Sequence, residues 1–310
     1  MKALKSTLLT ILIILIMTIV TISGFTISAF KKIKTNHIDE KKLEINTKLN
    51  EDIMNIAFFG LDNEINNNKN FNSIIIATLN LNTKKIKLTS IDKDILFDIE
   101  GYNKEKINYA YACGGPELAI KIINQAFDLN IRDYISIDFY NLVNIIDLID
   151  GINIELESHK IEQINKKIFE MNKLENLKEE TDYVYKLGLQ TLNRRQAIAY
   201  IEIAKESNKD FELVETQKII LEKIFDKIKC NSPNKAFNLI IDMFQYIETS
   251  FSIKDILNLT SICSKIEDFV IEKYKIPING TFETKIENRI SIIEIDLDRN
   301  KKIFHDNVNN

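Results

Sequence analysis

Residues 73–91 read SIIIATLNLNTKKIKLTSI, and this stretch predicts two neighbouring strands of a sheet. The first run, 73–81, is mostly apolar, as expected of a buried strand. The second run, 86–91, alternates apolar and polar residues, which is the period of a strand with one face on a core. The polar residues 82–85 between the two runs predict the turn of a hairpin.

Strand and helix patterns alternate along the chain on both sides of this hairpin. Further strands are expected where short apolar runs end in turn residues, at 56–59, 134–139, 151–157 and 290–295. Helices are expected where apolar residues recur at helical spacing, at 118–127, 142–149, 190–205, 214–228, 233–248 and 253–273. Because no Pro/Gly-rich linker interrupts this order, the chain predicts one mixed α/β domain, with the last strand returning to the sheet. The charged segment 158–186 is expected to be a surface excursion.

Composition excludes several classes of function. The net charge of −4 gives no reason to expect nucleic-acid binding. The 3 cysteines are widely spaced, and no CxxC or Cys/His ligand spacing occurs, so neither a disulfide framework nor a zinc site is supported. The 3 histidines fall near polar or terminal segments, and none is a candidate general base.

The N-terminal segment predicts a membrane anchor. Residues 6–30 carry no charge and are long enough to cross a bilayer as a helix, whereas the apolar region of a signal peptide is shorter. Lysines flank this segment on both sides, so the positive-inside rule does not orient it. The organisation expected is a short cytoplasmic N-terminus, a transmembrane anchor, a tether and one large domain, at 1–5, 6–30, 31–52 and 53–310.

Six segments follow one another along the chain: NIAFFGLD (55–62), SIIIATLNLNTKKIKLTSIDKDI (73–95), GYNKEKINYAYACGGPELAIKIIN (101–124), DYISIDFYNLVNIIDLIDGINIEL (133–156), LGLQTLNRRQAIAYI (187–201) and DFELVETQKIIL (210–221). Together and in this order they resemble the LytR–CpsA–Psr family of cell-wall glycopolymer transferases. The third is the closest match, through its Lys-Ile-Asn and Gly-Gly-Pro elements. The resemblance runs from about residue 55 to about residue 228.

The resemblance implies a three-layer α/β/α sandwich with a central mixed sheet, preceded by the transmembrane helix and placed outside the cell. It also implies an apolar pocket for a polyprenyl chain and a polar mouth for its pyrophosphate. Members of the family are similar in moving a glycopolymer from a polyprenyl-pyrophosphate carrier to peptidoglycan, with a divalent metal such as magnesium. The expected partners are therefore that lipid-linked glycopolymer, peptidoglycan and the cell membrane, and the expected location is the membrane, in a single-pass topology.

Only some of the family's metal-binding and catalytic residue types are found at the matching positions of this chain. Asp62 matches the family's first acidic position, with a role on the metal or the phosphates. The second metal position falls at Asn72, which offers an amide oxygen but no charge. The family's Pro-Arg-Asp motif reads DKD at 92–94, so Lys93 and Asp94 take its catalytic places, with a lysine where the bidentate arginine stood.

The substrate-binding positions implied by the resemblance are Lys106, Asn108 and Gln217. The family's phosphate-gripping arginines are missing from this chain: the Tyr-x-Arg-x-Arg motif reads YIEIA at 200–204, and other residues occupy the remaining positions. Lys205 and Lys106 are candidate substitutes for the lost positive charge. The pair of arginines at 194–195 is expected to have a surface role.

Two hypotheses for function follow from this mixture, and the sequence leaves both open. One is a membrane-anchored phosphotransferase with a rearranged site. The other is a catalytically weak or inactive homologue that binds the lipid-linked glycopolymer, or a partner enzyme, in a regulatory or scaffolding role. Removing one donor to a transition state typically lowers the rate by a factor of about 10²–10³. The missing arginines therefore count against the first hypothesis. A membrane-anchored sensor is a third possibility.

Overall fold

The computed structural model describes residues 34–49, 52–62, 70–99, 101–207, 210–231, 233–252, 254–255, 269–287 and 290–309. At its centre lies a 7-stranded sheet with the order β1-β10-β7-β2-β3-β4-β11. In the same order, these strands are Lys34–Thr35, Glu248–Thr249, Asp133–Asp138, Ile53–Asp62, Asn70–Asn80, Lys85–Ile91 and Val270–Ile276. The β2–β7 and β4–β11 pairs are parallel and the β2–β3 and β3–β4 pairs antiparallel, so the sheet is mixed.

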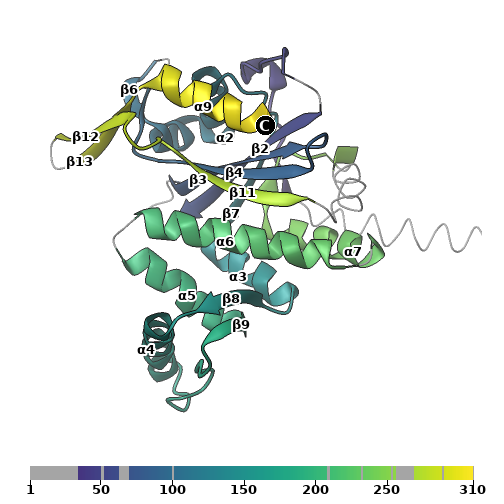
Figure 1. Ribbon diagram of the computed structural model, residues 1–310, viewed down its shortest axis with the longest axis vertical. Helices are drawn as coiled ribbons and strands as arrows, with labels where there is room; N and C mark the ends of the chain where they lie inside the picture. The colour runs from purple at the N-terminus through teal and green to yellow at the C-terminus, as the bar shows by residue number, and fades with distance from the viewer. Residues whose placement is uncertain are drawn as a thin grey trace, which may run out of the picture.

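Helices cover both faces of this sheet (Figure 1). One face carries α2 (Ile107–Phe127) and α9 (Leu297–Asn309). The other carries the four helices α3, α5, α6 and α7, which are Phe139–Leu148, Arg194–Glu206, Asp210–Lys229 and Pro233–Met243. Two buried apolar clusters follow from this layering, one on each face. The expected mixed α/β fold with a central mixed sheet is confirmed.

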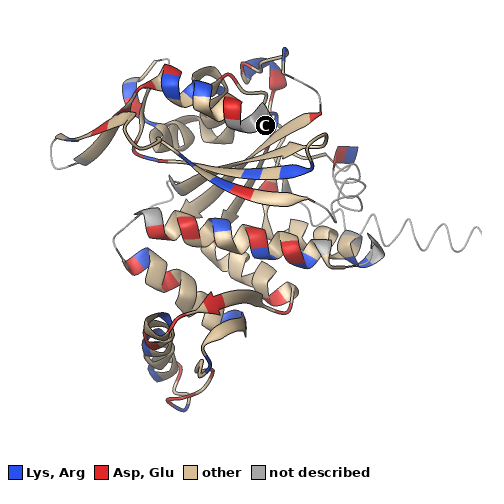
Figure 2. Cartoon of the chain, viewed as in Figure 1, with Lys and Arg blue, Asp and Glu red and all other residues tan. Residues whose placement is uncertain are grey.

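The β3 strand shows why its sequence is almost continuously apolar. Ile74 and Ile76 pack into the cluster on the α2 side, whereas Ile75, Ala77 and Leu79 pack into the cluster on the α6 side. Successive side chains of a strand point to opposite faces, so a strand covered on both faces needs apolar residues at every position. Charged residues of both signs lie mainly along the outer helices, and the middle strands carry few (Figure 2).

A small lobe extends from the α5 side of the molecule (Figure 1). It holds α4 (Ser158–Leu174) and the antiparallel strands β8 (Ile152–Leu156) and β9 (Gly188–Leu192). The expectation that 158–186 contains no core element is therefore wrong. Ile161, Ile164 and Ile168 are buried on one stripe of α4, and the charges occupy its other faces.

The C-terminal third differs from expectation in two elements. Residues 270–273, predicted to end a helix, begin β11 instead, and 256–268 lie outside the described residues. The charged sequence of β11 resembles a solvated helix, but Glu272 meets Lys85 of β4 at 3.0 Å across the parallel pair. The strand β13 (Ile290–Ile295) forms a separate hairpin with β12 (Phe282–Glu287) and does not return to the central sheet.

A short hairpin and two 3₁₀ helices complete the description. The hairpin of β5 (Leu96–Ile99) and β6 (Asn103–Lys106) leads into α2, which begins before the Gly-Gly-Pro segment and bends at Gly115, where φ is +63°. Glycine tolerates this left-handed backbone because it has no Cβ. The 3₁₀ helices η1 (Glu40–Lys42) and η2 (Phe244–Tyr246) lie in connecting segments.

The predicted anchor at 6–30 lies outside the described residues. Among the helices that the structure does describe, none has the length and apolar character needed to span a bilayer. Part of the segment predicted as a tether packs on the domain: β1 pairs with β10 at the sheet edge, and Leu43 is fully buried.

Candidate functional site

Several chain segments meet at one edge of the central sheet. The parallel strands β2 and β7 both end there, with Leu61 beside Asp138, and β3 starts there, with Ser73 beside Gly60. The helix α3 begins directly after β7, and α5 ends next to the same edge. Ligands of open α/β sheets commonly bind beyond the carboxyl ends of the parallel strands. This edge is therefore the natural place to look for a site.

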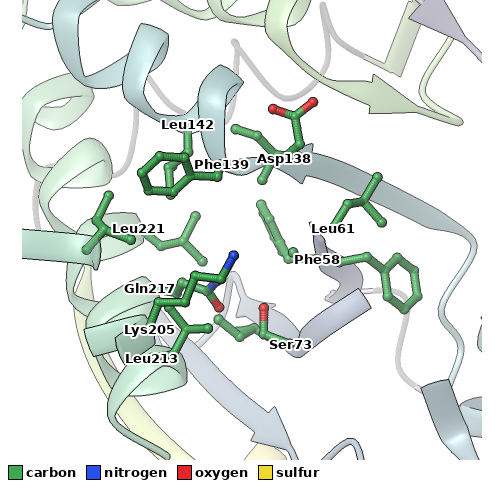
Figure 3. Close-up of a pocket in the computed structure, with 15 residues that line it drawn as sticks. Phe58, Leu61, Ser73, Asp138, Phe139, Leu142, Lys205, Leu213, Gln217 and Leu221 are labelled. Carbon is green, nitrogen blue, oxygen red and sulfur yellow. The ribbon is translucent and has the colours of Figure 1, made fainter. Parts of the chain in front are cut away.

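A pocket of about 60 Å³ opens at this edge, and we call it the mouth (Figure 3). Its polar side chains are Ser73, Asp138, Lys205 and Gln217. Figure 3 shows Lys205, Gln217 and Ser73 on the same side of the mouth, with the carboxylate of Asp138 turned away from them. The apolar remainder of the lining includes Leu61, Phe139 and Leu213.

The contact between β2 and α6 is close because residue 60 is glycine. A Cβ atom added to Gly60 would lie 2.3 Å from Ser73 Oγ and 3.2 Å from Gln217 Nε2. Gln217 Oε1 is buried and has no hydrogen-bond partner within the described part of the chain. A buried polar atom without a partner calls for an explanation, and a ligand that binds at the mouth is one.

Asp138 has a structural role at the mouth. Its Oδ1 accepts a hydrogen bond from the backbone N–H of Asn141 at 2.8 Å, and its Oδ2 accepts one from Asn141 Nδ2 at 2.8 Å. These bonds cap the N-terminus of α3 and neutralise part of its positive end. The carboxylate therefore places Phe139 against the pocket.

A second, larger cavity of about 250 Å³ adjoins the mouth between the sheet and the helices. Apolar side chains alone line it, from Ile56, Leu79 and Ile86 in the sheet to Ile224 and Met243 in α6 and α7. The two cavities share the lining residues Phe58, Ile137, Leu142 and Leu221. The site is therefore an apolar cavity that continues into a polar mouth.

Three of the predicted site residues belong to the segments that build the mouth. Gln217 lines it directly. Asp62 is the last residue of β2, next to Leu61, and Asn72 is the extra residue of a β-bulge beside Ser73. The side chains of Asp62 and Asn72 lie outside what the structure describes, so their predicted metal and catalytic roles stay predictions.

The other four predicted residues lie apart from the mouth lining. Lys93 and Asp94 follow the end of β4, at the same edge of the sheet. Asp94 Oδ1 accepts a hydrogen bond from Lys106 Nζ at 2.5 Å, which ties the turn after β4 to the start of α2. Asn108 lies in the first turn of that helix. Their catalytic and substrate-binding roles stay predictions.

Arginines do not line the mouth in the portion of the chain that the structure describes. Arg195 bonds to side chains of the α4 lobe, Arg194 to Asn144, and Arg132 to Glu40. The expected surface role of the 194–195 pair is consistent with these contacts. Among the described residues, the cation that lines the mouth is Lys205, the single lysine of α5, which follows the segment 200–204.

Tyr200 of that motif is buried in α5, and burial raises the pKa of its phenol, so it stays protonated at neutral pH. It packs in the cluster beneath α3 and α5 and does not line the mouth. Tyr200 is therefore a core residue of α5, and Lys205, one turn further along the helix, lines the mouth.

The described residues do not by themselves make a magnesium site. No group of three or more His, Cys, Asp or Glu in the described ranges is arranged to hold a metal ion. Magnesium usually binds through one or two carboxylates together with substrate phosphates and water. The described carboxylate at the mouth, Asp138, already accepts two hydrogen bonds from Asn141. A site would need Asp62, so magnesium binding stays a prediction.

Sequence reasoning did not single out Ser73 or Asp138. Ser73 sits at the start of an apolar strand, and Asp138 at a strand–helix junction, where an N-cap residue is common. The usable signal for Asp138 was its position at the end of a parallel strand. Ser73 carried no signal, because its exposure to the mouth depends on the bulge beside it.

Comparison with known proteins supports one family. Residues 20–307 match the LytR_cpsA_psr family. The chain is 25% identical over 222 residues to the polyisoprenyl-teichoic acid–peptidoglycan teichoic acid transferase TagT of Bacillus subtilis, covering 69% of this chain and 65% of TagT. It is 26% identical over 259 residues to the corresponding transferase TagU of Bacillus licheniformis, covering 80% of this chain and 78% of TagU. The regulatory protein MsrR of Staphylococcus aureus is 27% identical over 177 residues, 56% of this chain and 49% of MsrR.

Solved structures show the same fold. The crystal structure of B. subtilis TagT superimposes with a TM-score of 0.65 at 19% identity, covering 90% of this chain and 100% of that one. The structure of TagT with bound octaprenyl pyrophosphate lipid gives a TM-score of 0.60 at 18% identity, covering 89% of this chain and 94% of that one. Because the family match spans nearly the whole chain, this protein belongs to the LytR–CpsA–Psr family.

Proposed function

We propose that this protein is a membrane-anchored phosphotransferase that moves a glycopolymer from a polyprenyl-pyrophosphate carrier onto peptidoglycan. The observation that carries this proposal is the apolar cavity continuing into the polar mouth. An amphiphile with a long hydrocarbon tail and an anionic head is likewise made of one apolar and one polar part. The names of TagT and TagU, and the lipid bound in one TagT structure, give independent support.

The two parts of the ligand are bound by different forces. The isoprenoid tail gains free energy by leaving water for the apolar cavity, at roughly 25 cal/mol per Å² of apolar surface buried. The pyrophosphate gains from charge and hydrogen bonds at the mouth. There Lys205 supplies a positive charge, and the Ser73 hydroxyl can donate a hydrogen bond. The Gln217 amide can donate from Nε2, and its Oε1 can accept a hydrogen bond from the ligand.

The proposed reaction is a displacement at phosphorus. A hydroxyl of peptidoglycan forms a bond to the phosphorus that carries the glycopolymer, and the bridging bond of the pyrophosphate breaks. Polyprenyl phosphate leaves, and the hydroxyl proton passes to a carboxylate. Asp62 is the candidate for that carboxylate, or for holding magnesium, because β2 ends with it beside the mouth. Magnesium, when bound, would offset negative charge on the phosphates.

The proposed location is the cell membrane, with residues 6–30 as the anchor and the domain outside. The support is the uncharged sequence of that segment and the peptidoglycan substrate, which lies outside the membrane. Fusion of a reporter that is active only outside the cytoplasm to the C-terminus tests the orientation. Reporter activity is expected, and an inactive but intact fusion would contradict the outside placement.

The central experiment measures glycopolymer transfer by the full chain in lipid nanodiscs. The reactants are a polyprenyl-pyrophosphate-linked glycan and peptidoglycan fragments, with Mg²⁺ or with EDTA. We expect transfer with Mg²⁺, loss of transfer with EDTA, and a decrease of about 10²–10³ in rate for Asp62→Ala. The matched control is Asp98→Ala, which removes an exposed carboxylate from β5 and should leave the rate unchanged.

A second candidate function is a homologue that binds the lipid-linked glycopolymer without turning it over. The absence of arginine from the described lining of the mouth favours it, because a lysine cannot grip phosphate oxygens bidentately. The same assay separates the two candidates. Saturable binding of the lipid without detectable transfer would favour the binding protein and contradict the phosphotransferase.

A further inference from the structure

Two adjacent faces of α5 carry opposite charges where the helix approaches the mouth. Ile201 and Lys205 lie four residues apart, so they share one face of the helix, and both line the mouth. Glu202 and Glu206 also lie four residues apart and form the next row on the helix surface. They do not line the mouth, but they lie three residues before and one residue after Lys205. Two carboxylates therefore border the cation of the mouth.

A lysine from the neighbouring helix holds both of these carboxylates. Lys167 extends from α4, which packs against α5 (Figure 1). Its Nζ donates a hydrogen bond to Glu206 Oε1 and forms an ion pair with Glu202 Oε2 at 3.3 Å. A third carboxylate oxygen, Glu170 Oε2 of α4 itself, lies 3.6 Å away. One ammonium group thus faces three carboxylates, and two of these belong to the helix that carries Lys205.

The lysine of this cluster is less exposed than the two carboxylates of α5. The side chain of Lys167 is 16% exposed, whereas those of Glu202 and Glu206 are 32% and 61% exposed. The hydrogen bond to Glu206 raises the pKa of Lys167, so its ammonium stays charged at neutral pH. Without that charge, Glu202 would be able to pair with Lys205, three residues further along the helix. Both carboxylates would also repel an anion bound at the mouth.

We propose that Lys167 is a positioning residue of the mouth: it holds Glu202 and Glu206 on the α4 side of α5 and keeps their negative charge away from a bound pyrophosphate. This inference rests on the proposed function and adds to it a residue outside the mouth lining. Lys167 acts through the two carboxylates and needs no contact with the ligand. The α4 lobe therefore contributes to the charge of the site as well as to the fold.

The test uses Lys167→Met on the full chain in nanodiscs, because methionine keeps most of the side chain and removes the ammonium. Its probes are polyprenyl pyrophosphate and the uncharged polyprenol of the same chain length. Affinity for the pyrophosphate should fall by about 3- to 10-fold, as expected for one or two carboxylates released several ångströms from an anion. Affinity for polyprenol should not change. The defect should shrink when the salt concentration is raised from about 0.1 M to about 1 M, which shortens the Debye length from about 10 Å to about 3 Å.

Second substitutions separate positioning from a structural role. Glu202→Gln and Glu206→Gln, introduced together into Lys167→Met, should restore the affinity for the pyrophosphate, because they remove the charges that Lys167 holds. Glu170→Gln in the same background should not restore it, since Glu170 belongs to α4 and does not border Lys205. Lys167→Arg should bind both probes as the wild type does, because it retains the positive charge.

The matched control is Lys173→Met, which removes an ammonium from the last turn of the same helix. Lys173 Nζ lies 4.4 Å from the ring centroid of Phe169, and its loss should change neither affinity. Equal weakening of both probes by Lys167→Met, unchanged binding of the pyrophosphate, or no rescue by the two glutamines would each overturn the positioning role. The proposed function would stand in all three cases. A wild-type chain that binds neither probe would overturn both.

Discussion

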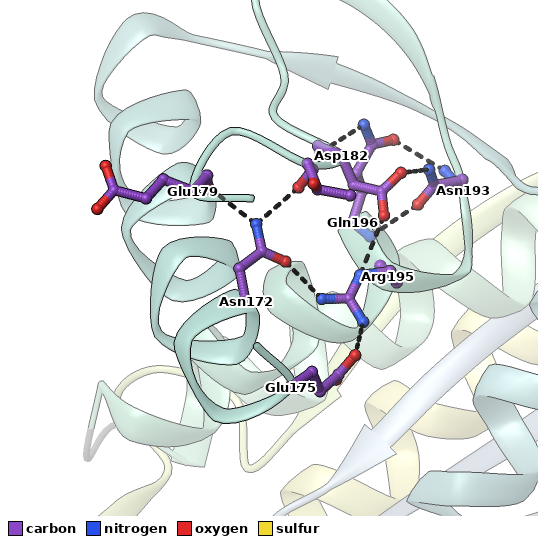
Figure 4. A network of polar contacts seen from close by, with 8 residues as sticks. Asn172, Glu175, Glu179, Asp182, Asn193, Arg195 and Gln196 are labelled. Atoms are coloured by element: carbon purple, nitrogen blue, oxygen red, sulfur yellow. Dashed lines mark hydrogen bonds and ion pairs between the residues drawn. The ribbon is translucent and has the colours of Figure 1, made fainter. Parts of the chain in front are cut away.

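The polar side chains of the α4 lobe and those of the mouth differ in how completely they are hydrogen-bonded. In the lobe, Arg195 is surrounded by acceptors: Nη1 meets Glu175 at 2.5 Å and Nη2 meets Asn172 Oδ1 at 2.7 Å (Figure 4). Its Nε has no hydrogen bond of good geometry but faces Asp182 Oδ2 at 3.0 Å as an ion pair. Asn172 in turn donates to the carbonyls of Glu179 and Thr181. The polar groups of this network therefore bond to one another within the lobe.

At the mouth, by contrast, one buried polar atom is left unsatisfied. Gln217 Oε1 is buried without a hydrogen-bond partner in the described part of the chain, opposite a glycine that keeps the space open. A complete network stabilises the fold, whereas an incomplete one costs stability and is retained where a ligand completes it. The comparison teaches that Arg195 serves structure in the lobe and that a lysine, Lys205, lies at the mouth. Three substitutions test this division.

The largest effect is expected for Lys205→Ala, which removes the described cation of the mouth. Loss of one charged donor to a phosphoryl transition state should lower the transfer rate by about 10²–10³. Lys205→Arg should retain most of the rate, because it restores a charge at the same position. The measurement is single-turnover transfer of glycopolymer in nanodiscs, with the affinity for the carrier measured in parallel.

The control for this substitution is Lys302→Ala, on the exposed surface of α9. It should leave both the rate and the affinity unchanged. If Lys205→Ala behaved like the control, the positive charge at the mouth would be dispensable. The contrast between a structural Arg195 and a functional Lys205 would then be wrong.

A smaller effect, on stability rather than on function, is expected for Arg195→Ala. The substitution leaves Glu175, Asp182 and Asn172 without their common donor, and the free energy of unfolding should fall by about 2–3 kcal/mol. Denaturant unfolding measures this loss. Affinity for polyprenyl pyrophosphate should not change, because the lobe does not line the mouth.

Arg132→Ala is the comparison for the loss of stability expected in Arg195→Ala. Its bridge to Glu40 at 2.8 Å is exposed, and such pairs contribute about 0–1 kcal/mol. Equal destabilisation by the two variants would contradict the structural role assigned to the Arg195 network. Weakened lipid binding in Arg195→Ala, at unchanged stability, would assign that arginine to the site instead.

The smallest effect is expected for Gln217→Met, which replaces a buried amide with an apolar side chain of similar length. Removing an acceptor that has no partner should raise the free energy of unfolding by about 1 kcal/mol. The same change should weaken carrier binding, because the mouth loses a group that the pyrophosphate engages. Thermal unfolding and lipid-binding titration on one preparation test both. A variant that is less stable yet binds normally would show that Gln217 is structural.

Elements of the fold could be predicted where the residues that specify them are adjacent in the sequence. The β3–β4 hairpin was predicted because its apolar runs and its turn are adjacent in the sequence. The burial of α4 was not, because three isoleucines on one stripe are a weak signal among charged neighbours. The strand β11 was missed because its charged residues pair with residues far away in the sequence, Glu272 with Lys85 of β4 and Lys273 with Glu222 of α6.

The candidate site shows the same limit. The motif resemblance indicated Gln217, and Lys205 as a substitute cation, and both line the mouth. It also indicated Asp94 and Lys106, which the structure joins to each other by an ion pair away from the mouth lining. Ser73 and Asp138 came to light only when several segments met at one edge of the sheet.

The sequence by itself determined the mixed α/β class, the central hairpin and the family, since each depends on residues that are close in the chain or on motifs in a fixed order. The burial of both faces of β4 was not expected, because its alternating pattern predicts one face on the core. Only the tertiary structure decided that Lys205 lines the mouth, and that Gln217 Oε1 has no hydrogen-bond partner there within the described part of the chain. The physical reason is that charge and hydrogen bonding act through space over a few ångströms. They therefore depend on which helix ends next to which strand, and sequence spacing does not encode this.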